Sequence, residues 1–80
     1  MEKHIELLWA TLMSSTDADL APRLKKKMNT HELVDTLSAL EREVSDMEVH
    51  RAIALLKAVI GGKRKEEDFQ LQCHKIAGMV

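Results

Sequence analysis

The chain has 80 residues, one cysteine and a formal net charge of −1, and this length accommodates one small domain at most. A charge so close to zero argues against a protein whose whole surface attracts nucleic acid or anionic lipid. The lone cysteine excludes an intrachain disulfide and fits a reducing compartment. No apolar run approaches the roughly 20 residues that span a bilayer. We therefore expect a soluble, cytoplasmic protein.

The residue types favour helix over sheet. Trp9 and Phe69 are the only aromatic residues, whereas Leu, Met, Ala, Glu and Lys are plentiful, and these are good helix formers. We therefore predict an all-α fold, a small bundle of four to five short helices in a single domain spanning residues 1–80. Residues 1–62 should form its core, and residues 63–80 a turn of basic and acidic residues followed by a weak C-terminal amphipathic helix.

The first helix is expected from about Glu2 to Met13, because its apolar side chains repeat with helical spacing and share one face. These are Ile5, Leu8, Trp9, Leu12 and Met13. Three hydroxyl residues, Ser14 to Thr16, then compete for backbone hydrogen bonds and predict a turn.

A short second helix is expected next. Asp19 is a plausible N-cap, because Pro22 then falls in the first turn, where its missing N–H group costs nothing. Leu20, Leu24 and Met28 would form the buried side of this helix.

Thr30 is the expected cap of a third helix, whose apolar residues alternate spacings of four and three. They are Leu33, Leu37, Leu40, Val44 and Met47. A second run of this kind begins at Val49, but its phase is shifted by two residues, and one continuous helix cannot bury both runs against one partner. The shift coincides with Ser45 to Glu48, which has the form of a capping box. We therefore predict a break near Ser45 and a fourth helix that starts at Asp46.

The fourth helix is apolar nearly all round, since only Lys57 is polar between Ala52 and Ile60. Such a helix must be covered on several sides, either at the centre of a bundle or at the seam of an oligomer. Glycines at positions 61 and 62 should end it. The predicted core of the domain is Leu37, Leu40, Ile53, Leu56 and Ile60.

A last helix is expected to begin near Lys65, because three acidic residues follow that position and acids suit a first turn. Its apolar face would carry Phe69, Cys73, Ile76, Ala77 and Val80. This face is weak, so the helix would dock on the core, on a second copy or on a partner, or it would fray.

Metal and catalytic chemistry have little support in the sequence. Cys73 and His74 are adjacent, but neighbouring helical positions point about 100° apart and do not easily share an ion. The other three histidines lie on three different predicted helices. There is no phosphate-binding glycine loop and no recognisable nucleophile motif. We therefore expect no cofactor, no metal site and no enzymatic activity.

Association with proteins is the expected function: a non-enzymatic regulator or adaptor that binds another protein, and itself as a homodimer, through apolar helix faces. The predicted partner or dimer interface consists of Ile5, Leu8, Trp9, Leu12, Val49, Ile53, Leu56 and Ile60. The stretch Leu37–Ile60 resembles, in its leucine spacing and a Leu-Glu pair, the helix-turn-helix half of small enteric connector proteins that influence biofilm and stress regulation. This resemblance covers under a third of the chain and assigns no residue a role.

Nucleic-acid binding is the alternative function, because a basic cluster supplies the side chains that contact phosphate. The possible anion contacts are Arg23, Lys25, Lys26 and Lys27. Against this alternative, the helix that follows is rich in acidic residues and would repel a phosphate backbone.

Overall fold

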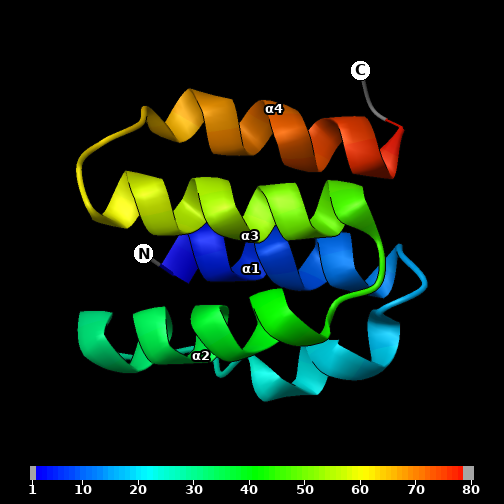
Figure 1. Ribbon diagram of the computed structural model, residues 1–80, viewed down its shortest axis with the longest axis horizontal. Coiled ribbons are helices and arrows are strands. Elements are labelled where there is room, and N and C mark those ends of the chain that lie inside the picture. Colours follow the sequence, from blue (N-terminus) through cyan, green and yellow to red (C-terminus); the bar gives the residue numbers. More distant parts are fainter. Residues whose placement is uncertain (1, 79–80) are drawn as a thin grey trace.

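The computed structural model describes residues 2–78, and in this range the chain forms five helices and no strand (Figure 1). They are α1 (Glu2–Met13), the 3₁₀ helix η1 (Ala18–Arg23), α2 (Thr30–Glu43), α3 (Met47–Ile60) and α4 (Glu66–Ala77). The prediction of an all-α fold with four to five short helices is therefore confirmed for the described residues. Within the same range, every helix is too short or too polar to cross a membrane.

The central element is α3, which packs against α4, α2 and α1. Figure 1 shows the four α-helices with nearly parallel axes, and the chain reverses direction between α2 and α3 and again between α3 and α4. Three helices of the same chain thus cover the apolar stretch of α3, so no second copy is needed to shield it from water. Lys57, the one polar residue in that stretch, reaches Glu41 on α2 with a nitrogen–oxygen distance of 3.0 Å.

One hydrophobic core joins all the helices. Four of the five predicted core residues, Leu37, Leu40, Ile53 and Leu56, have no solvent exposure, whereas Ile60 is only partly buried. Phe69 is also fully buried, as is Cys73 beside it on α4. Of the outcomes that the sequence left open for the last helix, the structure shows docking on the core of the same chain. Of the predicted face of α4, Ala77 is exposed and Val80 lies outside the described residues.

The inward face of α1 differs from the predicted one. Ile5, Leu8 and Leu12 are buried as expected, but Trp9 is 43% exposed and Met13 is exposed too. The buried face of α1 lies on the side away from Trp9 and Met13, because α4 packs against that side. On that flank His4 stacks on Phe69 of α4, with ring centroids 5.9 Å apart.

The second helix is shorter and tighter than predicted. It is a 3₁₀ helix that ends at Arg23, with Pro22 inside it, and the predicted N-cap Asp19 is an exposed residue within it. Of the three side chains predicted to be buried here, Leu24 is buried, whereas Leu20 and Met28 are half-buried.

Asp17, the residue before η1, fixes this segment to the junction between α2 and α3. The residue is only 5% exposed. It accepts hydrogen bonds from the backbone N–H of Ser45 (3.0 Å), the hydroxyl of Ser45 (2.9 Å) and the backbone N–H of Asp46 (3.2 Å). Burial by itself would raise the pKa of Asp17, but these hydrogen bonds favour the ionised form and together hold the pKa below its usual value.

The predicted break between the third and fourth helices is confirmed, but both N-caps differ by one residue. Asn29, rather than Thr30, caps α2 by accepting a hydrogen bond from the N–H of Glu32 at 2.8 Å. Asp46, rather than Ser45, caps α3 by accepting one from the N–H of Glu48 at 2.8 Å. Ser45 is not a cap because its hydroxyl donates to Asp17 instead. Met47, predicted to continue the apolar run of the third helix, opens α3 and is 75% exposed.

The two glycines end α3 as predicted. Gly62 adopts a left-handed φ of 74°, and the N–H groups of Gly62 and Lys63 return to the carbonyls of Val59 and Ala58. This is the Schellman arrangement, in which glycine avoids the steric cost that a side chain would meet. It turns the chain so that α4 runs back along α3 (Figure 1).

Candidate functional site

Most of the residues predicted as an interface lie inside the monomer. Six of the eight are buried in the core of the single chain: Ile5, Leu8, Leu12, Val49, Ile53 and Leu56. As folded here, these side chains have no surface to offer a partner. Only Trp9 and the partly buried Ile60 retain surface. The sequence identified most residues of the apolar faces, but it could not separate the residues that build the core from those that remain on the surface.

The basic cluster is exposed, but half of it is paired. Arg23, on η1, forms an ion pair with Glu43 at the end of α2. Lys27 lies 4.0 Å from Glu2. Lys25 and Lys26 are exposed in the segment that leads to α2, and Lys26 borders a hollow of about 310 Å³ beside Trp9. Local acids therefore reduce the positive potential that the sequence suggested.

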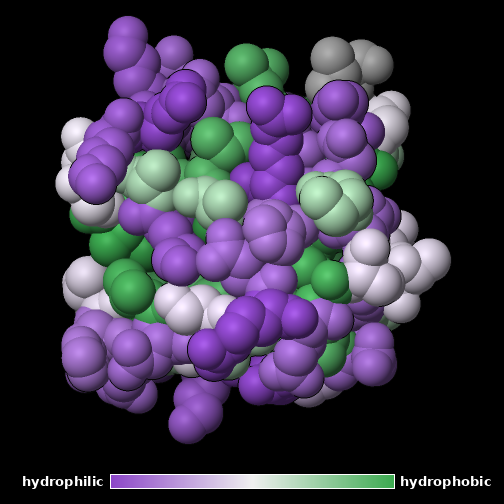
Figure 2. All heavy atoms as spheres, in the orientation of Figure 1, coloured by the Kyte–Doolittle hydropathy of each residue, from purple (hydrophilic) through white to green (hydrophobic). Residues whose placement is uncertain are grey.

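A hollow of about 700 Å³ lies between α3 and α4. We call it the α3–α4 groove. Its apolar part consists of Ala54, Leu55 and Ala58 on α3 and Leu71 on α4. Leu71 is 59% exposed. Figure 2 shows apolar surface interrupted by hydrophilic side chains on the face where α3 and α4 lie side by side.

Helical spacing explains how the groove forms. Ala54 and Ala58 are four residues apart, so they share one side of α3, and their small side chains leave a depression there. On the α4 side, Asp68, Leu71 and Lys75 are spaced three and four residues apart and form one stripe. The core-facing side of α3 carries larger residues, so α3 is widely buried on one side and thinly covered on the other.

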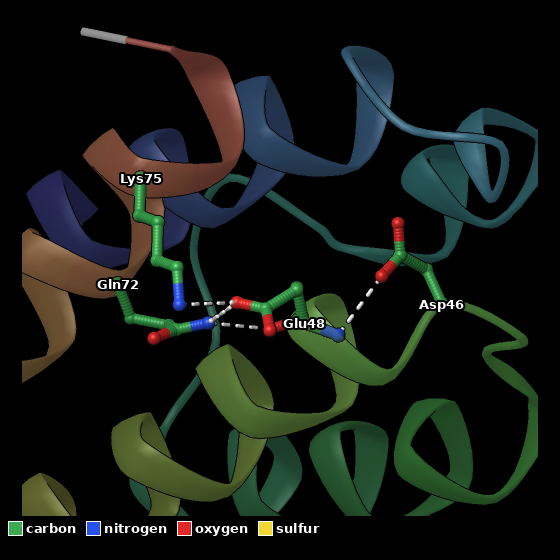
Figure 3. Close-up of polar contacts among 4 residues, drawn as sticks. All are labelled: Asp46, Glu48, Gln72 and Lys75. Atoms are coloured by element: carbon green, nitrogen blue, oxygen red, sulfur yellow. Dashed lines mark hydrogen bonds and ion pairs between the residues drawn. The ribbon is translucent and has the colours of Figure 1, made fainter. Parts of the chain in front are cut away.

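A polar network closes one end of the groove and joins α3 to α4 (Figure 3). The side-chain amide of Gln72 donates to the backbone carbonyl of Glu48 at 3.0 Å and to its carboxylate at 2.9 Å. Lys75 lies 3.3 Å from the same carboxylate. The hydrogen bond from Gln72, followed by the contact with Lys75, lowers the pKa of Glu48. The network keeps Glu48 ionised and fixes Gln72, which is buried, at the edge of the groove.

The rim of the groove is positively charged. Arg51, Arg64 and Lys75 line it, against one acid, Asp68. Among the described residues, neither Arg51 nor Arg64 has a carboxylate within 4.0 Å. Arg51 acts on Glu48 at longer range, where its charge contributes to the lowered pKa of that carboxyl. A chain of net charge −1 thus places positive charge without close acidic partners around an open apolar surface.

The described residues show little arranged chemistry outside this groove. No three His, Cys, Asp or Glu side chains within residues 2–78 lie close enough to hold a metal ion. Burial raises the pKa of the Cys73 thiol, and a hydrogen bond with Thr11 offsets part of that effect. A buried thiol held in its neutral form is a poor nucleophile. The expectations of no cofactor and no catalysis stay predictions.

Comparison of the chain with protein-family models, with curated proteins and with solved structures finds no match. These comparisons therefore give no support to the resemblance of Leu37–Ile60 to connector proteins. Any functional argument for this chain depends on its own surface.

Proposed function

We propose that this chain is a small non-enzymatic helical protein that acts by binding another protein, as an adaptor or regulator, and that the α3–α4 groove is its binding surface. The observation that carries the proposal is the exposure of Leu71 over the alanine side of α3, beside guanidinium groups without acidic partners. Exposed apolar surface rimmed by polar groups is typical of protein-binding sites. Arginine is also enriched at the desolvated centres of protein interfaces.

The groove fits a protein partner better than a small-molecule substrate. It is an open trench along two helices, whereas substrate sites usually enclose most of the ligand surface. The ionisable groups at its end, Glu48 and Lys75, are engaged with each other and with Gln72. Their arrangement stabilises the junction of the helices, and it leaves no base and nucleophile in contact with each other.

The proposal is tested by comparing two variants at exposed apolar residues. A tagged chain captures proteins from an extract of its own cells, a captured protein is identified by mass spectrometry, and binding is then measured with both proteins purified. Leu71→Asp should weaken binding by about tenfold or more, because it places a carboxylate at the centre of the contact. Met47→Asp is the matched control, since Met47 is 75% exposed and does not line the groove. Equal affinity of the Leu71→Asp chain and the unaltered chain would contradict the proposal.

Homodimerisation stays a separate proposal. The large apolar residues of α1 and α3 are used inside the monomer, so a dimer would have to form through surface such as Trp9, Met13 or the groove itself. Sedimentation equilibrium over a wide concentration range measures the mass directly. A constant monomer mass at high concentration would refute the dimer without affecting the binding of another protein.

Nucleic-acid association is the second candidate function, and one observation favours it. Lys25 and Lys26 are exposed in the segment beside Trp9, and an exposed indole next to basic side chains suits a stacked base. A mobility-shift assay with single-stranded and duplex DNA and RNA, at about 50 and 200 mM salt, tests it. Salt-sensitive retardation that is lost in Lys25→Gln/Lys26→Gln supports this function, and its absence at the lower salt refutes it.

A further inference from the structure

We infer that the occupant of the α3–α4 groove is an acidic amphipathic helix of another protein. The inference rests on the proposed function and adds the chemistry of the partner. It requires three features together: a trench of helical dimensions, an apolar floor, and free positive charge along the rim.

The dimensions of the groove suit a helix. From Arg51 to Ala58 the α3 wall advances seven residues, about two helical turns or 10 Å. A docked helix would therefore insert two or three apolar side chains, spaced three or four residues apart, into a hollow of about 700 Å³. Small residues on the floor matter here, because Ala54 and Ala58 allow the axis of a third helix to approach α3 closely.

The charges select the polar flanks of that helix. Arg51 lies on α3 and Arg64 just before α4, and neither has an acidic partner within 4.0 Å among residues 2–78. Guanidinium groups pair with carboxylates through two parallel hydrogen bonds, so each can hold one Glu or Asp of the partner. Lys75 already contacts Glu48 and adds less. A helix with basic flanks would instead be repelled at two positions and attracted only by Asp68.

Other occupants fit less well. The phosphates of a nucleic acid would be repelled by the carboxylate of Asp68, and the apolar floor of the groove has no groups that bind their charge. An anionic lipid surface is flat and would contact the rim without filling the trench. A second copy of this chain could present acidic residues of α2, but its own apolar side chains on that helix, Leu33, Leu37 and Leu40, are buried in its core. The structure therefore favours a partner of a different sequence.

The probe is a synthetic helical peptide of about 18 residues, roughly 27 Å long, with leucines on one face and glutamates on both flanks. Two matched peptides replace the glutamates by glutamine or by lysine. Fluorescence anisotropy gives the affinities, and amide chemical shifts of the isotope-labelled chain locate the contact. We expect the glutamate peptide to bind about tenfold more tightly than the glutamine peptide and to shift the amides of Ala54, Ala58 and Leu71.

A charge exchange makes the test specific. Arg51→Glu/Arg64→Glu should reverse the preference, so that the lysine peptide binds more tightly than the glutamate peptide. Lys3→Glu/Lys63→Glu is the control, with the same change of charge at exposed residues that do not line the groove, and it should keep the original preference. Circular dichroism shows that all variants fold, which is expected because every altered side chain is exposed.

Each alternative outcome overturns the inference. No binding of the glutamate peptide at millimolar concentration, equal affinity for the glutamine peptide, or shifts outside the groove would each refute an acidic helix as the occupant. Binding to vesicles of anionic lipid in place of the peptide would point to a membrane. Shifts of the groove amides on raising the concentration of the chain alone would point to a second copy. The capture experiment with Leu71→Asp is independent of these results, so the proposed function can survive the failure of this inference.

Discussion

Replacing Asp17 by alanine should lower the free energy of unfolding by about 3 kcal/mol at pH 7. The change removes three hydrogen bonds to one carboxylate, from the backbone and hydroxyl of Ser45 and from the backbone of Asp46. Hydrogen bonds to charged groups contribute about 1.5–3 kcal/mol each when desolvated. Ser45 is exposed, so water replaces part of the loss, and about 1 kcal/mol per bond is the appropriate figure. That sum is a large fraction of the roughly 4–12 kcal/mol expected for a domain of this size.

The effect should depend on pH in a defined direction. The pKa of Asp17 is lower in the folded chain than its usual value of 3.8, so the ionised form is preferred in the folded state. The corresponding stabilisation is complete above the unfolded pKa and is lost as the pH falls through the folded pKa. The difference in stability between the unaltered chain and Asp17→Asn should therefore be largest near neutral pH and shrink below about pH 4.

Urea denaturation followed by circular dichroism at several pH values measures both effects. Asp19→Ala is the matched control, because Asp19 is an exposed acid in the same segment and has no side-chain hydrogen bond among the described residues. It should change the free energy of unfolding by about 0.5 kcal/mol or less. If Asp17→Ala and Asp19→Ala are equally stable, the carboxylate of Asp17 does not hold η1 to the junction of α2 and α3.

Three further predictions concern α4 and its entry turn. Phe69→Ala should destabilise the chain by about 3–5 kcal/mol in urea denaturation, because its ring is fully buried. Leu71→Ala is the control and should change the free energy of unfolding by about 0.5 kcal/mol or less. Similar losses in the two variants would show that α4 is not part of the core. Gly62→Ala should lower the free energy of unfolding by about 1–2 kcal/mol, because φ is 74° there. Gly61→Ala should be neutral or slightly stabilising, since its φ is −78° and an added Cβ meets only ordinary contacts. Thermal melts of the two variants give the comparison. The Cys73 thiol is buried and its pKa is raised, so a disulfide reagent at pH 8 should modify the folded chain slowly and the urea-unfolded chain rapidly; equal rates would place the thiol at the surface.

The helices could be predicted because their signals are local. Apolar spacing identifies α1, α2 and α3, and the phase shift near Ser45 locates the break between the last two. The N-caps were missed by one residue because neighbouring residues compete: Asn29 with Thr30, and Asp46 with Ser45. In the second case the outcome depends on Asp17, a residue 28 positions earlier that takes the hydroxyl of Ser45. No local pattern contains that information.

The groove could not be predicted for a related reason. Its parts are visible in the sequence. Ala54 and Ala58 are four residues apart. Leu71 lies between two glutamines and at helical spacing from Asp68 and Lys75. Such patterns show that residues share a face of one helix. They do not show that the face of α3 and the stripe of α4 lie beside each other. That placement depends on the turn at Gly61 and Gly62 and on Phe69 entering the core.

The apolar excess of α3 thus corresponds to the first of the two alternatives that the sequence left open, the centre of a bundle. Three helices of the same chain cover its large residues, and this coverage accounts for Val49, Ile53 and Leu56 without a partner. What remains open is the side with the smallest residues, where Ala54 and Ala58 leave space and Leu71 is exposed beside it. The core side of α3 therefore accounts for stability, and the proposed binding surface lies on the other side of the same helix. A substitution at Ala52, which is fully buried, must disturb packing, whereas one at Ala54 fills the groove and leaves the core intact.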